Sequence, residues 1–151
     1  STGKVLDTLS KLNLDENTLV IFTSDNGPWW EGSGGQFRDR KGSSWEGGMR
    51  VPFIARWTGT IPAAAVSGEP AMNIDLFPTL LAAADSALPS GNEIDGRDIL
   101  PMLQGKTPSP HEALYLFDKD RIAGVRSGHW KCKLCQKHHP KASLELRLNQ
   151  L

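Results

Sequence analysis

Two adjacent side chains that carry oxygen atoms, Asp25 and Asn26, directly follow a short apolar segment of the chain. The carboxylate of Asp25 and the amide carbonyl of Asn26 are hard oxygen donors, the kind of ligand that Ca²⁺ and Mg²⁺ prefer. Gly27 follows them, and an Asp-Asn-Gly triplet alone is typical of a tight turn. The residue types therefore suit a metal site, and only the surrounding sequence separates that interpretation from an ordinary turn.

Lys41 lies in a basic and glycine-rich segment, residues 38–52. Its ammonium is a compact positive charge. A metal ion and an ammonium at one rim suit a tetrahedral oxyanion, because the metal holds one oxygen atom and the ammonium contacts another. Taken alone, Lys41 would be interpreted as a solvated loop lysine, since lysines are mostly exposed. Its position between the Asp25-Asn26 pair and Glu46 favours contact with an anion.

An apolar strand on each side of a long loop must position these residues. Residues 18–22 form a continuous apolar run rich in β-formers, which is typical of a parallel strand covered on both faces. Residues 27–48 carry many glycines and little periodicity, and a structureless loop of this length is usually functional or disordered. Residues 51–57 then predict a second strand. Ligands of open α/β sheets bind beyond the carboxyl ends of strands, so we predict the site there.

The remaining elements follow from turn and periodicity signals. A helix is expected over residues 3–12, and another begins at an Asp75 cap and runs to Ala84. We also predict a short helix over residues 99–103 and an antiparallel hairpin formed by residues 113–117 and 122–126. The predicted domains are residues 1–87, residues 88–131 as a smaller lobe, and residues 132–151 as an unassigned basic tail.

In this order the segments resemble the sulfatase family, within the alkaline-phosphatase-like superfamily. The resemblance covers roughly residues 1–131 and implies an α/β fold class: part of a mostly parallel sheet flanked by helices, plus a smaller carboxyl-terminal antiparallel lobe. It rests on several motifs in one collinear order, which is far more specific than any single motif. These are Asp25-Asn26-Gly27, Lys41-Gly42, residues 46–52 (EGGMRVP), residues 73–81, residues 95–103 and residues 125–131 (VRSGHWK).

The resemblance implies that Asp25 and Asn26 are two ligands of a Ca²⁺ ion that holds a sulfate ester. It implies that Lys41 contacts the sulfate and takes part in catalysis. The family's nucleophile is a formylglycine made from a cysteine in a Cys-x-Pro-Ser-Arg type motif, and the 151 residues contain no such motif. We therefore predict the carboxyl-terminal portion of a sulfuric ester hydrolase, inactive alone, with formylglycine in a preceding part.

Two alternatives stay open at this point. One is a phosphatase or phosphodiesterase relative of the same superfamily, although Asn26 argues against it because the imidazole that suits zinc would be expected there. The other is a non-catalytic anion-binding module. The charge balance, 17 basic against 17 acidic residues, gives no indication of nucleic acid as a partner, and we expect no membrane insertion. The resemblance implies an extracytoplasmic location, and the oligomeric state is left open.

Several other side chains have two interpretations. Trp29, Trp30 and Trp45 either form a stacking wall for a sugar or aryl group or close the loop over the core, and the second is slightly favoured. Glu46 and Arg50 are predicted either to form a structural ion pair or to hold backbone carbonyls, rather than to act as acid and base. Arg38 and Arg40 are taken as surface charges by default. A zinc site at Cys132, Cys135, His138 and His139 is disfavoured, because the two ligand pairs lie too close together in sequence.

Overall fold

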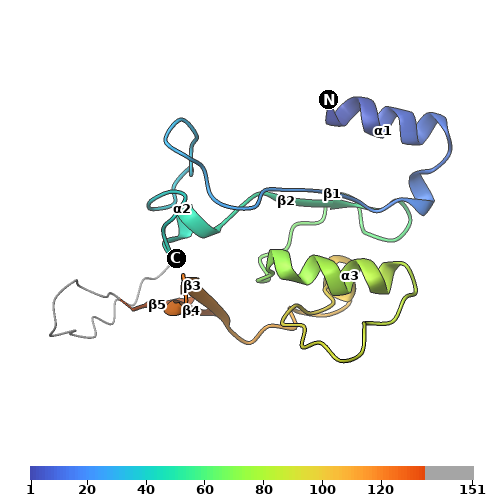
Figure 1. Ribbon diagram of the computed structural model, residues 1–151. Helices are drawn as coiled ribbons and strands as arrows, with labels where there is room; N and C mark the ends of the chain where they lie inside the picture. The colour runs from blue at the N-terminus through green and yellow to red at the C-terminus, as the bar shows by residue number, and fades with distance from the viewer. Residues whose placement is uncertain (135–151) are drawn as a thin grey trace, which may run out of the picture. The chain divides into compact units, whose positions relative to one another are not determined.

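The structure is a computed structural model that describes residues 1–134 of the 151-residue chain (Figure 1). Its contacts divide the chain into two compact units. The first combines Ser1–Thr23 with Pro52–Pro110, and the second combines Ser24–Val51 with the segment that begins at His111. Each unit thus joins segments that are distant in sequence, whereas the predicted domains are consecutive. The predicted domain boundaries stay a prediction.

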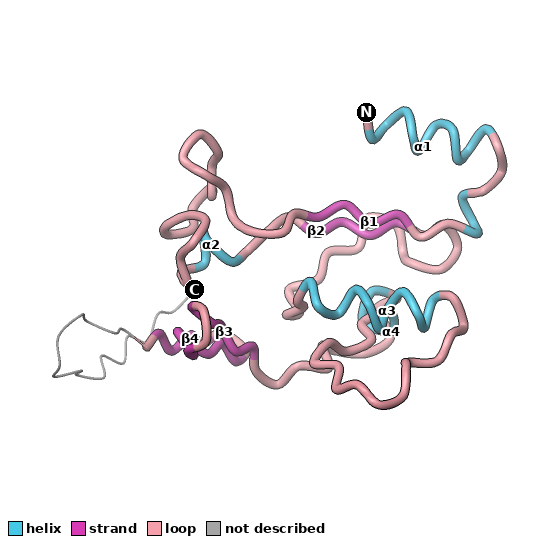
Figure 2. The backbone as a smooth tube through the Cα atoms, viewed as in Figure 1, coloured by secondary structure: helices cyan, strands magenta, loops and turns pink. Residues whose placement is uncertain are grey.

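The first unit begins with α1 (Thr2–Lys11), the short η1 (Asp15–Asn17) and β1 (Val20–Thr23). β1 pairs antiparallel with β2 (Phe53–Arg56), and Figure 2 shows the two strands side by side. The prediction of a mostly parallel sheet is therefore not borne out by the pairing within residues 1–134. The apolar run of β1 predicts a strand, but such a run does not specify the direction of the neighbouring strand.

The remaining regular elements of the first unit are helical: η2 (Asn73–Asp75), α3 (Leu76–Ala83) and α4 (Leu100–Leu103). Asp75 is fully buried and precedes α3, but it makes no side-chain capping bond to that helix. Its carboxylate instead accepts hydrogen bonds from the backbone N–H groups of Met72, at 2.7 Å, and Arg97, at 2.9 Å. Buried polar groups need such partners. Asp75 therefore joins the start of α3 to the segment that leads into α4.

The second unit contains α2 (Glu46–Met49) and a three-stranded antiparallel sheet in the order β3-β4-β5. Its strands are β3 (Leu114–Asp118), β4 (Arg121–Ser127) and β5 (Trp130–Lys133). The predicted hairpin is confirmed as β3-β4, and β5 extends it. Within residues 1–134 the buried apolar side chains include Ile99, Met102 and Pro78 in the first unit, and Trp45, Leu114 and Ala123 in the second.

Within residues 1–134 no helix is long and apolar enough to cross a membrane. Cys132 lies on β5. Cys135, His138 and His139, the other members of the disfavoured zinc site, lie outside the described residues.

Candidate functional site

Asp25 and Asn26 lie directly after the end of β1, at the beginning of the second unit, as the sequence predicts. Asp25 is exposed and Asn26 is partly exposed. The Asn26 Nδ2 donates a hydrogen bond to Asp25 Oδ1, so the two side chains lie against each other. In the described part of the chain no three His, Cys, Asp or Glu side chains gather in one place. The pair therefore offers two adjacent oxygen donors rather than a complete protein cage.

Lys41 lies in the same unit as this pair, and its backbone N–H donates a 3.0 Å hydrogen bond to the carbonyl of Pro28. The pKa of Asp25 is lowered, chiefly by a hydrogen bond from its own backbone N–H, against an opposing effect of desolvation. The Asn26 amide and the charge of Lys41 lower this pKa further. Asp25 therefore keeps its negative charge to a lower pH than an ordinary aspartate does.

Backbone contacts join α2 to the Asp25 turn and to the loop at Arg38. The N–H of Gly27 donates a 3.0 Å hydrogen bond to the carbonyl of Gly48, and the N–H of Gly47 donates a 2.8 Å bond to the carbonyl of Arg38. A Cβ atom on Gly27 would overlap the carbonyl of Gly47, and one on Gly47 would overlap the carbonyl of Asp39. Glycine is required here because backbone approaches backbone. The Asp-Asn-Gly and Glu-Gly-Gly motifs thus pack on each other.

We expect the change Gly47→Ala to lower the free energy of unfolding by roughly 1–3 kcal/mol, since the added methyl meets backbone that has little room to move. Thermal or denaturant unfolding measures the effect. Gly34→Ala is the matched control, because a Cβ on Gly34 would lie at ordinary contact distance, 3.6 Å, from its nearest atoms. Equal losses in the two variants would contradict the close approach at Gly47.

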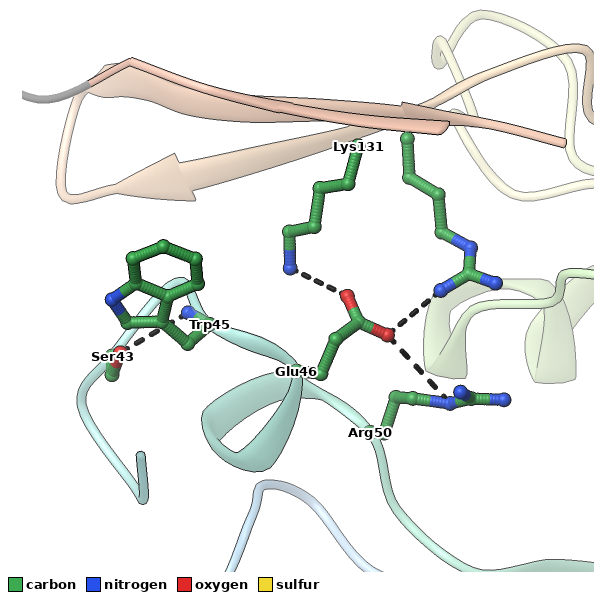
Figure 3. Close-up of polar contacts among 6 residues, drawn as sticks. Ser43, Trp45, Glu46, Arg50 and Lys131 are labelled. Atoms are coloured by element: carbon green, nitrogen blue, oxygen red, sulfur yellow. Dashed lines mark hydrogen bonds and ion pairs between the residues drawn. The ribbon is translucent and has the colours of Figure 1, made fainter. Parts of the chain in front are cut away.

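Glu46, at the start of α2, accepts a 2.7 Å bond from Arg126 Nη1 and a 2.6 Å bond from Lys131 Nζ. The Nε of Arg50 lies 3.8 Å from Glu46 Oε2, so the predicted ion pair is confirmed (Figure 3). It is the longest of the three contacts of the Glu46 carboxylate. The Glu46 side chain is only 12% exposed and that of Lys131 only 3%. This ion-pair group, Glu46 with Arg126 and Lys131, fixes α2 to the sheet.

Sequence reasoning missed Arg126 and Lys131 as partners of Glu46. The two cations are directly opposite each other on β4 and β5, so their side chains share one face of the sheet. A signal was present in the motif VRSGHWK, where a turn at Gly128 brings the two basic residues into register. The motif predicts that two basic side chains share one face of the sheet, but it does not predict which carboxylate pairs with them.

The three loop tryptophans have different environments. Trp45 is buried, with the Arg38 guanidinium and the Lys133 ammonium each 4.0 Å from the centroid of its ring. Closing the loop is therefore the right interpretation for Trp45. Trp29 and Trp30 are 61% and 73% exposed, so that interpretation is wrong for them.

Arg40 has a structural role that its prediction as a surface charge missed. Its Nη1 donates hydrogen bonds to the carbonyl oxygens of Trp29, at 3.0 Å, Trp30, at 2.9 Å, and Gly32, at 2.6 Å. Three carbonyl acceptors around one guanidinium hold this part of the loop in a defined turn.

The family model described as Sulfatase matches residues 1–86, the part of the chain that contains the Asp25-Asn26 pair, Lys41 and the glycine contacts. The chain belongs to the sulfatase family. It is 40% identical over 137 residues to steryl-sulfatase of Homo sapiens, an alignment that covers 83% of the chain and 24% of that protein. It is 42% identical over 137 residues to N-acetylgalactosamine-6-sulfatase of Canis lupus familiaris, covering 87% of the chain and 26% of that protein.

Solved structures agree with this assignment. The PsFucS1 sulfatase from Pseudoalteromonas sp. superposes with a TM-score of 0.80 at 31% identity, over 99% of this chain and 32% of that one. The sulfatase chain therefore has the α/β fold of that family, with small antiparallel sheets in its described part. It spans about a quarter of the length of the curated relatives named above.

Proposed function

We propose that this sulfatase chain contributes the calcium and sulfate contacts of a sulfuric ester hydrolase. Asp25 and Asn26 would bind Ca²⁺, and Lys41 would contact the sulfate group of the substrate. The observation that supports the proposal is that Lys41 and the two oxygen donors belong to one compact unit, in which the backbone N–H of Lys41 bonds to the carbonyl of Pro28, three residues after Asp25. Membership of the sulfatase family suggests that these oxygen donors and this cation would serve the hydrolysis of a sulfate ester.

The donor set fits calcium as a partial site. Ca²⁺ takes about six to eight oxygen ligands, and Asp25 and Asn26 would supply two of them. The lowered pKa of Asp25 favours the charged form that a cation needs. The remaining positions would be filled by substrate oxygen, water and residues outside the described pair.

The proposed roles of these side chains are electrostatic. Bound calcium would polarise the sulfate oxygens as a Lewis acid. Lys41 would place a positive charge where negative charge develops as the ester bond breaks. We expect the formylglycine nucleophile from outside these 151 residues, so the chain alone is expected to be inactive. An extracytoplasmic location stays a prediction.

The phosphatase and the non-catalytic alternatives are not favoured. The family model and the relatives named above are sulfatases, so a sulfate ester is the substrate class that we propose. Those relatives are named for different alcohols, a sterol in one case and an amino sugar in the other. Family membership therefore leaves the alcohol of the ester undecided.

Calcium should raise the melting temperature of the wild-type protein, and Asp25→Ala should abolish that rise. A ligand present at about 100 times its Kd stabilises the folded state by about 2.7 kcal/mol, which is a measurable shift. Thermal unfolding with calcium and with a chelator tests this in the full gene product. Asp7→Ala, which removes an exposed carboxylate of α1, is the matched control. An unchanged calcium response in Asp25→Ala would refute the ligand assignment.

A further inference from the structure

A hollow of about 360 Å³ lies within the second unit, on the loop that carries Lys41. Its lining includes Trp29, Trp30, Asp39, Arg40 and Lys41. This volume lies at the lower end of the range of small-molecule sites, about 300 to 1,000 Å³. The hollow thus has the size of a subsite for one part of a ligand, and it contains the side chain that we propose as the sulfate contact.

Two exposed indole rings form a corner of this hollow. The ring centroids of Trp29 and Trp30 are 6.5 Å apart and their planes meet at 79°. Large aromatic side chains contribute most when they are covered, so two neighbouring tryptophans that are 61% and 73% exposed indicate a binding surface. Perpendicular planes allow one ring to contact the face of a cyclic ligand while the other contacts its edge.

The aromatic corner is held in place before any ligand binds. The three hydrogen bonds from Arg40 to the carbonyl oxygens of Trp29, Trp30 and Gly32 fix the turn. The Arg40 guanidinium also lies 5.7 Å from the centroid of the Trp30 ring. A surface ordered in this way loses less conformational freedom on binding, which favours affinity.

We propose that Trp29 and Trp30 form the subsite for the alcohol portion of the substrate, and that this portion is a sugar ring. The inference rests on the proposed function, because a ring esterified to a sulfate at Lys41 would lie in the hollow that both indoles line. The C–H face of a sugar stacks on an indole, and its hydroxyl groups can hydrogen-bond to the carboxylate of Asp39. A hydrocarbon ring would displace water from that carboxylate and offer no hydrogen bond in its place. Burying a carboxylate without such a partner is unfavourable.

The test compares wild type with the double variant Trp29→Ala/Trp30→Ala in the full gene product. Calorimetry in the presence of calcium measures binding of sulfated monosaccharides, a sulfated sterol and inorganic sulfate. We expect the double variant to bind the sulfated monosaccharides about tenfold more weakly and inorganic sulfate equally well.

Trp130→Ala is the matched control, because Trp130 is 51% exposed and does not line the hollow. Both indoles are exposed, and the hydrogen bonds of Arg40 go to backbone carbonyls that alanine keeps, so the variant should fold. If it does not fold, the single variants Trp29→Leu and Trp30→Leu replace it.

The outcomes separate this inference from the proposed function. If Lys41→Ala leaves binding of inorganic sulfate unchanged, the proposed function fails. If that binding depends on Lys41 but the double variant binds the sulfated monosaccharides as well as wild type does, the aromatic subsite is overturned. A larger loss for the sulfated sterol than for the monosaccharides would overturn the choice of a sugar.

Discussion

Replacing Lys41 with alanine in the full gene product is expected to lower kcat for sulfate-ester hydrolysis by about 100- to 1,000-fold, the usual loss when one preorganised charge or donor is removed from a developing anion. The expected loss follows from the position of Lys41, an exposed residue that lines a hollow where an anion can reach it and that belongs to the same unit as Asp25. The fold should not change. Alanine keeps the backbone N–H of residue 41 that bonds to Pro28.

Steady-state kinetics with a chromogenic sulfate ester measures this loss, and the melting temperature checks the fold. Lys106→Ala removes another exposed lysine and is the matched control. Lys41→Arg keeps the charge but replaces a compact ammonium with a larger, planar guanidinium, so we expect a rate between those of wild type and Lys41→Ala. Equal rates for wild type and Lys41→Ala would remove Lys41 from the mechanism.

The change Glu46→Gln should lower the free energy of unfolding by roughly 3–5 kcal/mol, the usual cost of removing one partner of a buried ion pair. Glutamine has nearly the same shape but no charge, so Lys131, with a 3% exposed side chain, loses the anion that compensates it. Arg126, with a 16% exposed side chain, loses the same anion. Arg50 is 46% exposed and is solvated in either case, so it adds little.

Denaturant unfolding of the full gene product measures this cost. Glu31→Gln is the control, because Glu31 is exposed, and a change at such a surface site is usually within about 0.5 kcal/mol. The double change Glu46→Gln/Lys131→Met should cost less than the sum of the single changes, since it leaves neither charge without its partner. A loss in Glu46→Gln no larger than in Glu31→Gln would show that the ion-pair group does not stabilise the fold.

Local patterns in the sequence predicted the elements well. The helix expected over residues 3–12 is α1 (Thr2–Lys11), and the one expected from Asp75 to Ala84 is α3 (Leu76–Ala83). The hairpin and the strand before the Asp25-Asn26 pair were also predicted. Such features depend on side-chain periodicity and turn residues within a few positions of one another, so a single sequence contains them.

Contacts between distant segments were decided by the tertiary structure alone. Glu46 meets Arg126 and Lys131, which are 80 and 85 positions further along the chain, and the carboxylate of Asp75 meets the backbone of Arg97, 22 positions away. A buried charge or carboxylate needs a partner, but its chemistry does not say which of many candidates supplies it. The antiparallel pairing of β1 was missed for a similar reason, since an apolar run reports burial but not strand direction.

The sequence by itself determined the family of this sulfatase chain, and the site residues Asp25, Asn26 and Lys41 stay a prediction from its motifs. The tertiary structure decided which aromatic side chains are covered and which remain open. Trp45 is enclosed by Arg38 and Lys133, whereas Trp29 and Trp30 are left exposed on a turn that Arg40 holds. The physical reason is that exposure depends on which distant groups pack over a ring, and residue type alone does not specify them.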